Sequence, residues 1–176
     1  MSLPPIEPVH GYLPPGLHAA DIEAMRTRFV TEATHPKHRN TLFDGYLRLI
    51  AAISMMQIQT EQWIGGSFVS TRHAPNDIDL VNFCEVDAME SLPRELTAMI
   101  SQYFNGPETA KHCHCDSYYA PKAPANHPSR ELFEILANYW QNRLGKDRDN
   151  QPKGIVTITI GVEQPQAEEA DDDAAA

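Results

Sequence analysis

The chain has 176 residues, of which 41% are hydrophobic and 22% charged, so it suits one globular domain with a real core. This composition excludes the collagen, coiled-coil and wholly disordered classes. The formal net charge is −10, but residues 163–176 hold six acids and no Lys or Arg, which leaves −4 for residues 1–162. We therefore expect no broad basic surface for nucleic acid and no DNA partner.

Several features bear on the compartment. The longest apolar stretch, residues 49–56, contains Ser54 and is too short to cross a bilayer. The first residues include prolines where a signal peptide would have a charged start and an apolar run. An odd number of cysteines, three, argues against a disulfide framework. We expect a soluble, cytoplasmic protein with no membrane partner.

The two ends differ in composition from the middle. Residues 1–16 contain five of the 14 prolines, which predicts an extended arm. Residues 163–176 are mostly Ala, Glu, Asp, Gln and Pro, which predicts a disordered acidic tail. The domain itself is expected at residues 17–162.

Hydrophobic periodicity within this domain predicts four helices and four strands. The helices are expected at about residues 22–33, 40–56, 91–104 and 129–144. The strands are expected at residues 62–64, 77–84, 112–119 and 154–162. Taken in chain order, these elements predict an α+β domain in which helices flank a small mixed sheet.

The segment from Gly65 to Leu80 carries the most chemical information. Alternate residues of a strand share a face, so Asp77 and Asp79 are expected side by side. Two neighbouring carboxylates repel each other unless a cation lies between them. Oxygen ligands of this kind suit Mg²⁺, which completes its shell with water and substrate phosphates.

A second pattern lies about ten residues upstream, where Gly66-Ser67 follows a predicted strand at a turn. Glycine allows close approach of a phosphate to the backbone, and serine adds a hydroxyl and an amide N–H. A phosphate-binding turn near an acid pair is typical of a site that handles a nucleoside triphosphate.

Gly66-Ser67 followed by Asp77-Ile78-Asp79 resembles the signature of the DNA polymerase beta-like nucleotidyltransferase superfamily. The wider stretch is similar to a group of small bacterial and phage proteins with that domain. The segments Gly11–Gly16 and Lys153-Gly154-Ile155 resemble the same group. The resemblance covers roughly residues 10–162 and implies the nucleotidyltransferase fold.

That superfamily uses a third carboxylate on a later strand, for which Asp116 is the best candidate. The resemblance implies that Asp77, Asp79 and Asp116 are catalytic and bind two Mg²⁺ ions, with Mn²⁺ as a substitute. It also implies that Gly66 and Ser67 bind the NTP. A nucleoside monophosphate would pass to an acceptor (RNA, protein or small molecule) and pyrophosphate would leave.

Other residues in and near this region have ordinary explanations. Arg72 lies between the two halves of the motif and is within reach of a triphosphate, but a surface arginine is commoner. The run His112-Cys113-His114-Cys115 lacks the paired spacing of a structural zinc site, so Cys113 and Cys115 are expected in the core. Cys84, Trp63 and Trp140 are also expected there.

Two interpretations of the protein remain open at this point. The first is a magnesium-dependent nucleotidyltransferase that uses ATP or another NTP, of the kind found in toxin–antitoxin or phage-defence pairs. The alternative is a non-catalytic protein of the same fold, either an antitoxin-like regulatory subunit or a nucleotide sensor. No separate acceptor-binding domain is evident in this sequence, so a protein partner or a homo-oligomer is considered in both cases.

Overall fold

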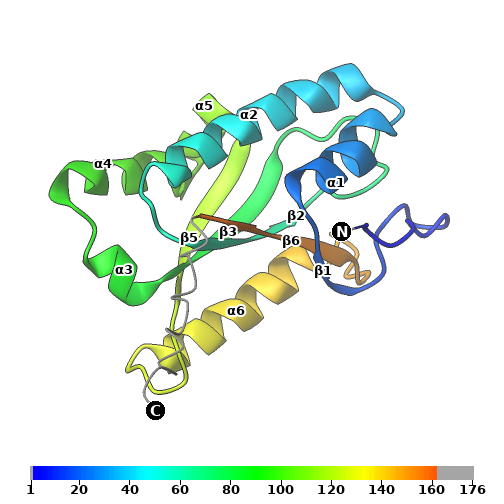
Figure 1. Cartoon of the computed structure of the whole chain (residues 1–176). Coiled ribbons are helices and arrows are strands. Elements are labelled where there is room, and N and C mark those ends of the chain that lie inside the picture. The colour runs from blue at the N-terminus through cyan, green and yellow to red at the C-terminus, as the bar shows by residue number, and fades with distance from the viewer. Residues whose placement is uncertain (1, 162–176) are drawn as a thin grey trace, which may run out of the picture.

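The computed structural model describes residues 2–161, and the predicted acidic tail at residues 163–176 lies outside them. A six-stranded mixed sheet runs through the molecule in the order β1-β6-β2-β3-β5-β4. Helices lie on both faces of this sheet (Figure 1). The expected α+β class with a mixed sheet flanked by helices is therefore confirmed.

The central strands are the most buried part of the sheet. They are β2 (Thr60–Gly65), β3 (Ile78–Glu85), β5 (Cys115–Lys122) and β6 (Gly154–Ile160). Strand β3 pairs antiparallel with β2 and parallel with β5, while β6 pairs antiparallel with β2. The two edges are formed by β1 (Gly16–Ala19) and β4 (Asn105–Gly106), neither of which the sequence predicted.

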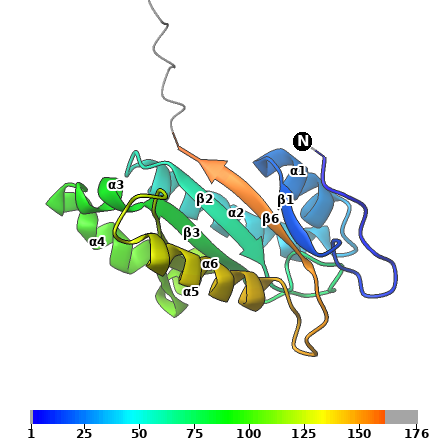
Figure 2. The same cartoon turned by 90° about the horizontal axis from the view of Figure 1, so that it is seen from below.

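Two apolar clusters lie on opposite faces of the sheet. The long helix α2 (Pro36–Ser54) covers one face and α6 (Arg130–Leu144) covers the other, as Figures 1 and 2 show. Because side chains alternate along β3, Ile78 and Leu80 pack on the α2 side, while Val81 and Phe83 pack against α6. Both faces of β3 are therefore packed against helices. This packing fixes the direction in which the side chains at the start of the strand point.

The remaining helices lie mainly along the α2 side of the molecule. They are α1 (Ile22–Arg26), the π-helical turn η1 (Thr27–Thr31), α3 (Val86–Glu90), α4 (Arg94–Tyr103) and α5 (Pro107–Cys113). Asp21 caps α1, because its carboxylate accepts the backbone N–H of Ala24 at 2.7 Å. The single helix predicted at 22–33 therefore ends as a π turn.

Two predicted boundaries are wrong for identifiable reasons. Helix α2 begins at Pro36, not at Asn40, because proline fits the first helical turn, and the Asn40 amide donates to Asp44 at 2.9 Å. The strand predicted at 112–119 begins only at Cys115. Residues 107–113 form helix α5, which places Pro107 in its first turn and ends with His114 in the left-handed region at φ 54°.

The segment before β1 runs along the domain and makes one isolated bridge, from Tyr12 to Ser70. The backbone N–H of Thr71 donates to the Gly11 carbonyl at 2.9 Å, and that of Gly154 donates to the Leu13 carbonyl at 2.9 Å. The Gly11–Gly16 segment therefore connects the loop after β2 with the start of β6. No helix among residues 2–161 is long and apolar enough to cross a membrane.

Candidate functional site

Two of the predicted acids lie next to each other near the N-terminal ends of the central strands β3 and β5. The pairing register places Gly65 of β2 opposite Asp79 of β3, and Asp79 opposite Asp116 of β5. Asp79 shares its strand face with Val81 and Phe83, so both carboxylates lie on the side covered by α6. The strand pairing therefore brings Asp116 to Asp79, although 36 residues separate them in the chain.

The carboxylate of Asp77 interacts electrostatically with those of Asp79 and Asp116. Burial and the nearby charge of Asp116 raise the pKa of Asp77 above its ordinary value. Burial, followed by the charges of Asp77 and Asp116, raises the pKa of Asp79 to about 6. Three carboxyl groups thus repel one another in a partly desolvated place. Their negative charge is largest above about pH 6, when Asp79 is ionised.

Gly66 makes the close approach to this cluster possible. Its backbone is left-handed, with φ at 68°, and a Cβ at this position would collide with the Asp79 carboxylate. The turn after β2 therefore lies directly against the Asp79 carboxylate. Ser67 follows Gly66 and lines a cavity beside these two residues. The predicted turn and the predicted acid pair are adjacent in space, as the sequence interpretation required.

A buried arginine holds the loop that follows this turn. Arg39 of α2 is only 1% exposed. Its guanidinium donates to the carbonyls of Phe68 and Ser70, both at 2.8 Å. It also donates to the carbonyls of Phe29 at 2.9 Å and Arg72 at 2.6 Å. Residues 68–72 are therefore fixed to α2 by one side chain, which sequence reasoning did not identify.

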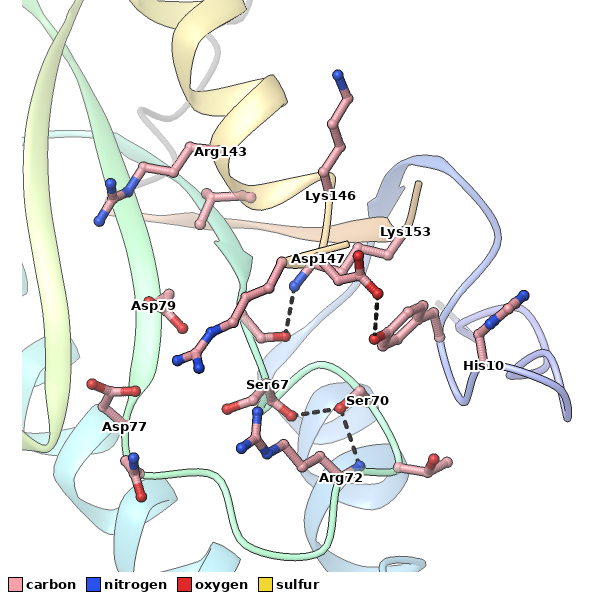
Figure 3. A pocket seen from close by; sticks show the side chains of 16 residues that line it. His10, Ser67, Ser70, Arg72, Asp77, Asp79, Arg143, Lys146, Asp147 and Lys153 are labelled. Atoms are coloured by element: carbon pink, nitrogen blue, oxygen red, sulfur yellow. Dashed lines mark hydrogen bonds between the residues drawn. The ribbon is translucent and has the colours of Figure 1, made fainter. Parts of the chain in front are cut away.

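The carboxylates open into a cavity of about 650 Å³ (Figure 3). Asp77 and Asp79 lie on one side of it, and the guanidinium groups of Arg72 and Arg143 point into it. The ammonium end of Lys146 points away from the acids. Further lining residues are Gly66, Ser67, Asn76, Asp147, Arg148 and Lys153. The cavity thus has Asp77 and Asp79 on one side, and its other lining residues include five Lys and Arg side chains and Asp147.

Asp116 lies close to Arg143, which is one of the residues that line the cavity. It does not line the cavity itself, but its carboxylate lies 4.0 Å from the Arg143 guanidinium. Asp116 is also a neighbour of Tyr118, whose hydroxyl pKa is raised by burial and by that carboxylate. Arg143 therefore connects the third acid to the cavity.

Lys153, immediately before β6, contacts the turn directly. Its ammonium donates to the Gly66 carbonyl at 3.0 Å, and the residue is only 7% exposed. Burial lowers its pKa, while the charges of Asp79 and Asp147 act in the opposite direction. The sequence marked Lys153-Gly154-Ile155 only as a resemblance, and Lys153 was not predicted as a site residue.

The cysteines and tryptophans are in the core, as predicted. Cys84, Cys113 and Cys115 are buried and free, and Trp63 and Trp140 pack between the sheet and α6. His112 lies in α5 and His114 caps it, so neither histidine belongs to the strand predicted at residues 112–119. Within residues 2–161, no three His, Cys, Asp or Glu side chains form a ready-made metal-binding group.

These features define an α+β domain in which three interacting carboxylates lie at the N-terminal ends of two central strands, beside a cavity that five Lys and Arg residues help to line. Residues 4–159 match the Family of unknown function (DUF6932), so the chain belongs to that family. Comparisons with curated proteins and with solved structures each found no match.

Proposed function

We propose that this protein is a metal-dependent nucleotidyltransferase of the DNA polymerase beta-like superfamily. It would transfer a nucleoside monophosphate from an NTP to an acceptor that is an RNA, a protein or a small molecule. One observation carries the proposal. Asp77, Asp79 and Asp116 interact beside the Gly66-Ser67 turn, and five Lys and Arg side chains are among the residues that line the cavity at this turn. A carboxylate cluster next to cationic side chains suits a metal-bound polyphosphate.

The donor set fits Mg²⁺ in its chemistry. All three groups are oxygen ligands, and burial, followed by repulsion from the neighbouring carboxylates, raises the pKa of Asp77 and Asp79. A divalent cation between them would remove that repulsion. Bound Mg²⁺ would neutralise phosphate charge and lower the pKa of an acceptor hydroxyl. Asp77 and Asp79 would hold both ions, and Asp116 would contribute to the one nearest the acceptor.

The chain's own groups account for binding of the triphosphate. Gly66 lets a phosphate approach the backbone, and Ser67 offers its hydroxyl and amide N–H. Arg72 and Arg143 point into the cavity, where a guanidinium can bind two phosphate oxygens at once. Arg39 donates to the carbonyls of Phe68, Ser70 and Arg72 and so holds the backbone of Arg72 in place. Together these residues would orient the α-phosphate toward the acids.

The decisive experiment is pyrophosphate release from each of the four NTPs with Mg²⁺ or Mn²⁺, with cell extract as the acceptor source. The full chain is compared with the Asp77→Asn/Asp79→Asn double variant, and NTP binding is read by thermal shift on the same samples. The matched control is Asp44→Asn, an exposed aspartate on α2 outside the cavity. We expect metal-dependent release by the wild type and by Asp44→Asn, and its loss in the double variant.

The alternative function is supported by one observation. Within residues 2–161 the carboxylates do not form a ready-made three-ligand group, as they need not in an NTP sensor or an antitoxin-like subunit. A thermal shift with NTP but no pyrophosphate release would favour the sensor. Folded protein with neither signal would favour the non-catalytic partner. Release that persists in the double variant would contradict the assigned acids.

A further inference from the structure

Lys153 differs from the other cations of the cavity in its burial. Arg72, Arg143, Lys146 and Arg148 are exposed, whereas Lys153 is only 7% exposed. Its ammonium donates to the Gly66 carbonyl at 3.0 Å, so it touches the backbone of the turn itself. A buried lysine with a defined acceptor is more precisely held than a solvated one.

The surroundings of Lys153 keep its side chain in that position. The Lys153 ammonium lies 5.9 Å from the centre of the Tyr12 ring, and the Tyr12 hydroxyl donates to Asp147 at 2.9 Å. The Lys153 backbone N–H donates to the Gly145 carbonyl at 2.8 Å. The N-terminal arm and the loop after α6 therefore both contact Lys153, the first through its ammonium and the second through its backbone.

Two acids face Lys153 from different elements. Asp79 on β3 and Asp147 in the loop after α6 both interact with its charge. The same charge of Lys153 acts on Asp79, where it opposes the repulsion from Asp77 and Asp116. The ammonium is therefore a fixed positive charge beside a carboxylate that the proposed function assigns to metal binding.

We propose that Lys153 is a positioning residue that holds the Gly66-Ser67 turn and makes the cavity favour a polyphosphate over a free divalent cation. The inference rests on the proposed function only for the identity of the ligand. The ammonium holds the Gly66 carbonyl, so this oxygen is not free to turn toward an anion. Its charge attracts phosphate, and it repels a cation that binds at Asp79 without phosphate.

The test is a pair of binding measurements on the full chain at pH 8, where Asp79 is ionised. Free Mn²⁺ is titrated by electron paramagnetic resonance, and tripolyphosphate without metal is titrated by calorimetry. Lys153→Gln keeps an N–H donor for the Gly66 carbonyl but loses the charge. We expect Mn²⁺ to bind about three- to tenfold more tightly and tripolyphosphate about tenfold more weakly. Lys153→Arg restores the charge and moves both affinities back toward those of the wild type.

The matched control is Lys111→Gln, which removes the same charge from an exposed side chain on α5 that pairs with Glu108. It should leave both affinities within about twofold of the wild type. If Lys153→Gln does not fold by circular dichroism, Lys153→Met carries the same test, because methionine suits a buried position. A merely structural role predicts that both ligands bind more weakly.

The outcomes separate this inference from the proposed function. Changes of opposite sign in the two affinities support the role of Lys153, whether or not pyrophosphate is released. Pyrophosphate release by the wild type, together with parallel losses or no change in the two affinities, overturns the role of Lys153 and leaves the transferase standing. Opposite changes without any release keep the inference and refute the transfer.

Discussion

Asp79 on β3 and Asp116 on β5 are register partners on adjacent parallel strands, and both carboxylates lie on the face covered by α6. Directly opposed like charges in a sheet are destabilising. Burial is the main cause of the raised pKa of Asp79, and the charges of Asp77 and then Asp116 raise it further. Without a bound cation this arrangement of carboxylates destabilises the fold. Such an arrangement beside a cavity is typical of a functional site.

The first prediction concerns the stability of the metal-free protein against pH. The pKa of Asp79 is about 6 in the folded state and near 3.8 in the unfolded chain. Between these values the folded state binds more protons, so this carboxyl lowers the free energy of unfolding as pH rises from about 4 to 6. Asp79→Asn removes the charge, and we expect it to be more stable than the wild type at pH 7 by about 2 kcal/mol.

Urea unfolding in EDTA at pH 4.5 and pH 7 measures this difference. The gain of Asp79→Asn over the wild type should be present at pH 7 and small at pH 4.5. Asp44→Asn on the exposed face of α2 serves as the matched control and should show no such pH dependence. An Asp79→Asn variant that loses stability equally at both pH values would contradict the pKa shift.

The second prediction separates Asp116 from the two acids at the start of β3. Asp116 lies outside the lining of the cavity and contacts Arg143 at 4.0 Å, so its removal leaves the triphosphate side intact. We expect Asp116→Asn to slow transfer by about 100-fold or more while NTP binding changes by about twofold at most. Single-turnover kinetics and thermal shift measure the two effects. Full turnover by this variant would show that the third acid is not catalytic.

The acid pair was predictable from the sequence because strand alternation is a local property. In β3, Ile78 and Leu80 point into the α2-side core, which fixes Asp79 on the opposite face. The pairing of Asp79 with Asp116 was only a candidate, because parallel register depends on contacts far apart in the chain. Helix α5 was missed because residues 112–119 combine a helix end and a strand start, and His114 in the left-handed region separates them.

The set of cations that lines the cavity was not predictable from the sequence. Arg72 lies in the loop before β3, Arg143 is in the last turn of α6 and Lys153 immediately precedes β6, so no local pattern connects these three residues. From the sequence alone, each is expected to be an ordinary surface cation. Only the folded sheet brings their segments together around the cavity. The resemblance around Lys153 was a sequence signal, but its role depends on the contact with Gly66, which only the fold creates.

The third prediction concerns the turn at Gly66. A side chain there is strained at φ 68° and its Cβ would also collide with the Asp79 carboxylate. We expect Gly66→Ala to lose about 2–4 kcal/mol of stability and to lose binding of both Mn²⁺ and tripolyphosphate. The control is Gly16→Ala, where φ is 126° but nothing lies within 4 Å of the added Cβ. That variant should lose stability through the backbone alone and keep both ligands.

Equal loss of ligand binding in both glycine variants would show that backbone strain, and not the approach to Asp79, explains Gly66. Chemical denaturation measures stability, and calorimetry measures binding on the folded fraction. Preserved Mn²⁺ binding in Gly66→Ala would contradict the assignment of this turn to the site.

The fourth prediction concerns Arg39, whose guanidinium donates to four carbonyl oxygens while nearly fully buried. Arg39→Met removes the charge but leaves those acceptors without their donor, so we expect a loss of about 3–5 kcal/mol. Arg39→Lys should recover only part of it, because an ammonium cannot reproduce the planar fork. Arg48→Met, which removes one exposed contact to the His112 carbonyl, is the control and should cost under about 1 kcal/mol.

The position of Arg39 predicts which segment will change when the guanidinium is removed, and how this will affect ligand binding. Its acceptors include the carbonyls of Phe68, Ser70 and Arg72, all in the loop between the turn and the acid pair. In Arg39→Lys the amide hydrogens of that loop should exchange faster than in the wild type, whereas those of β3 serve as the internal reference. Tripolyphosphate should also bind more weakly, because the backbone of Arg72 is no longer held. Hydrogen exchange measured by mass spectrometry resolves the two segments. Unchanged exchange in residues 68–72 of Arg39→Lys would show that the loop is held by its own packing and not by the guanidinium.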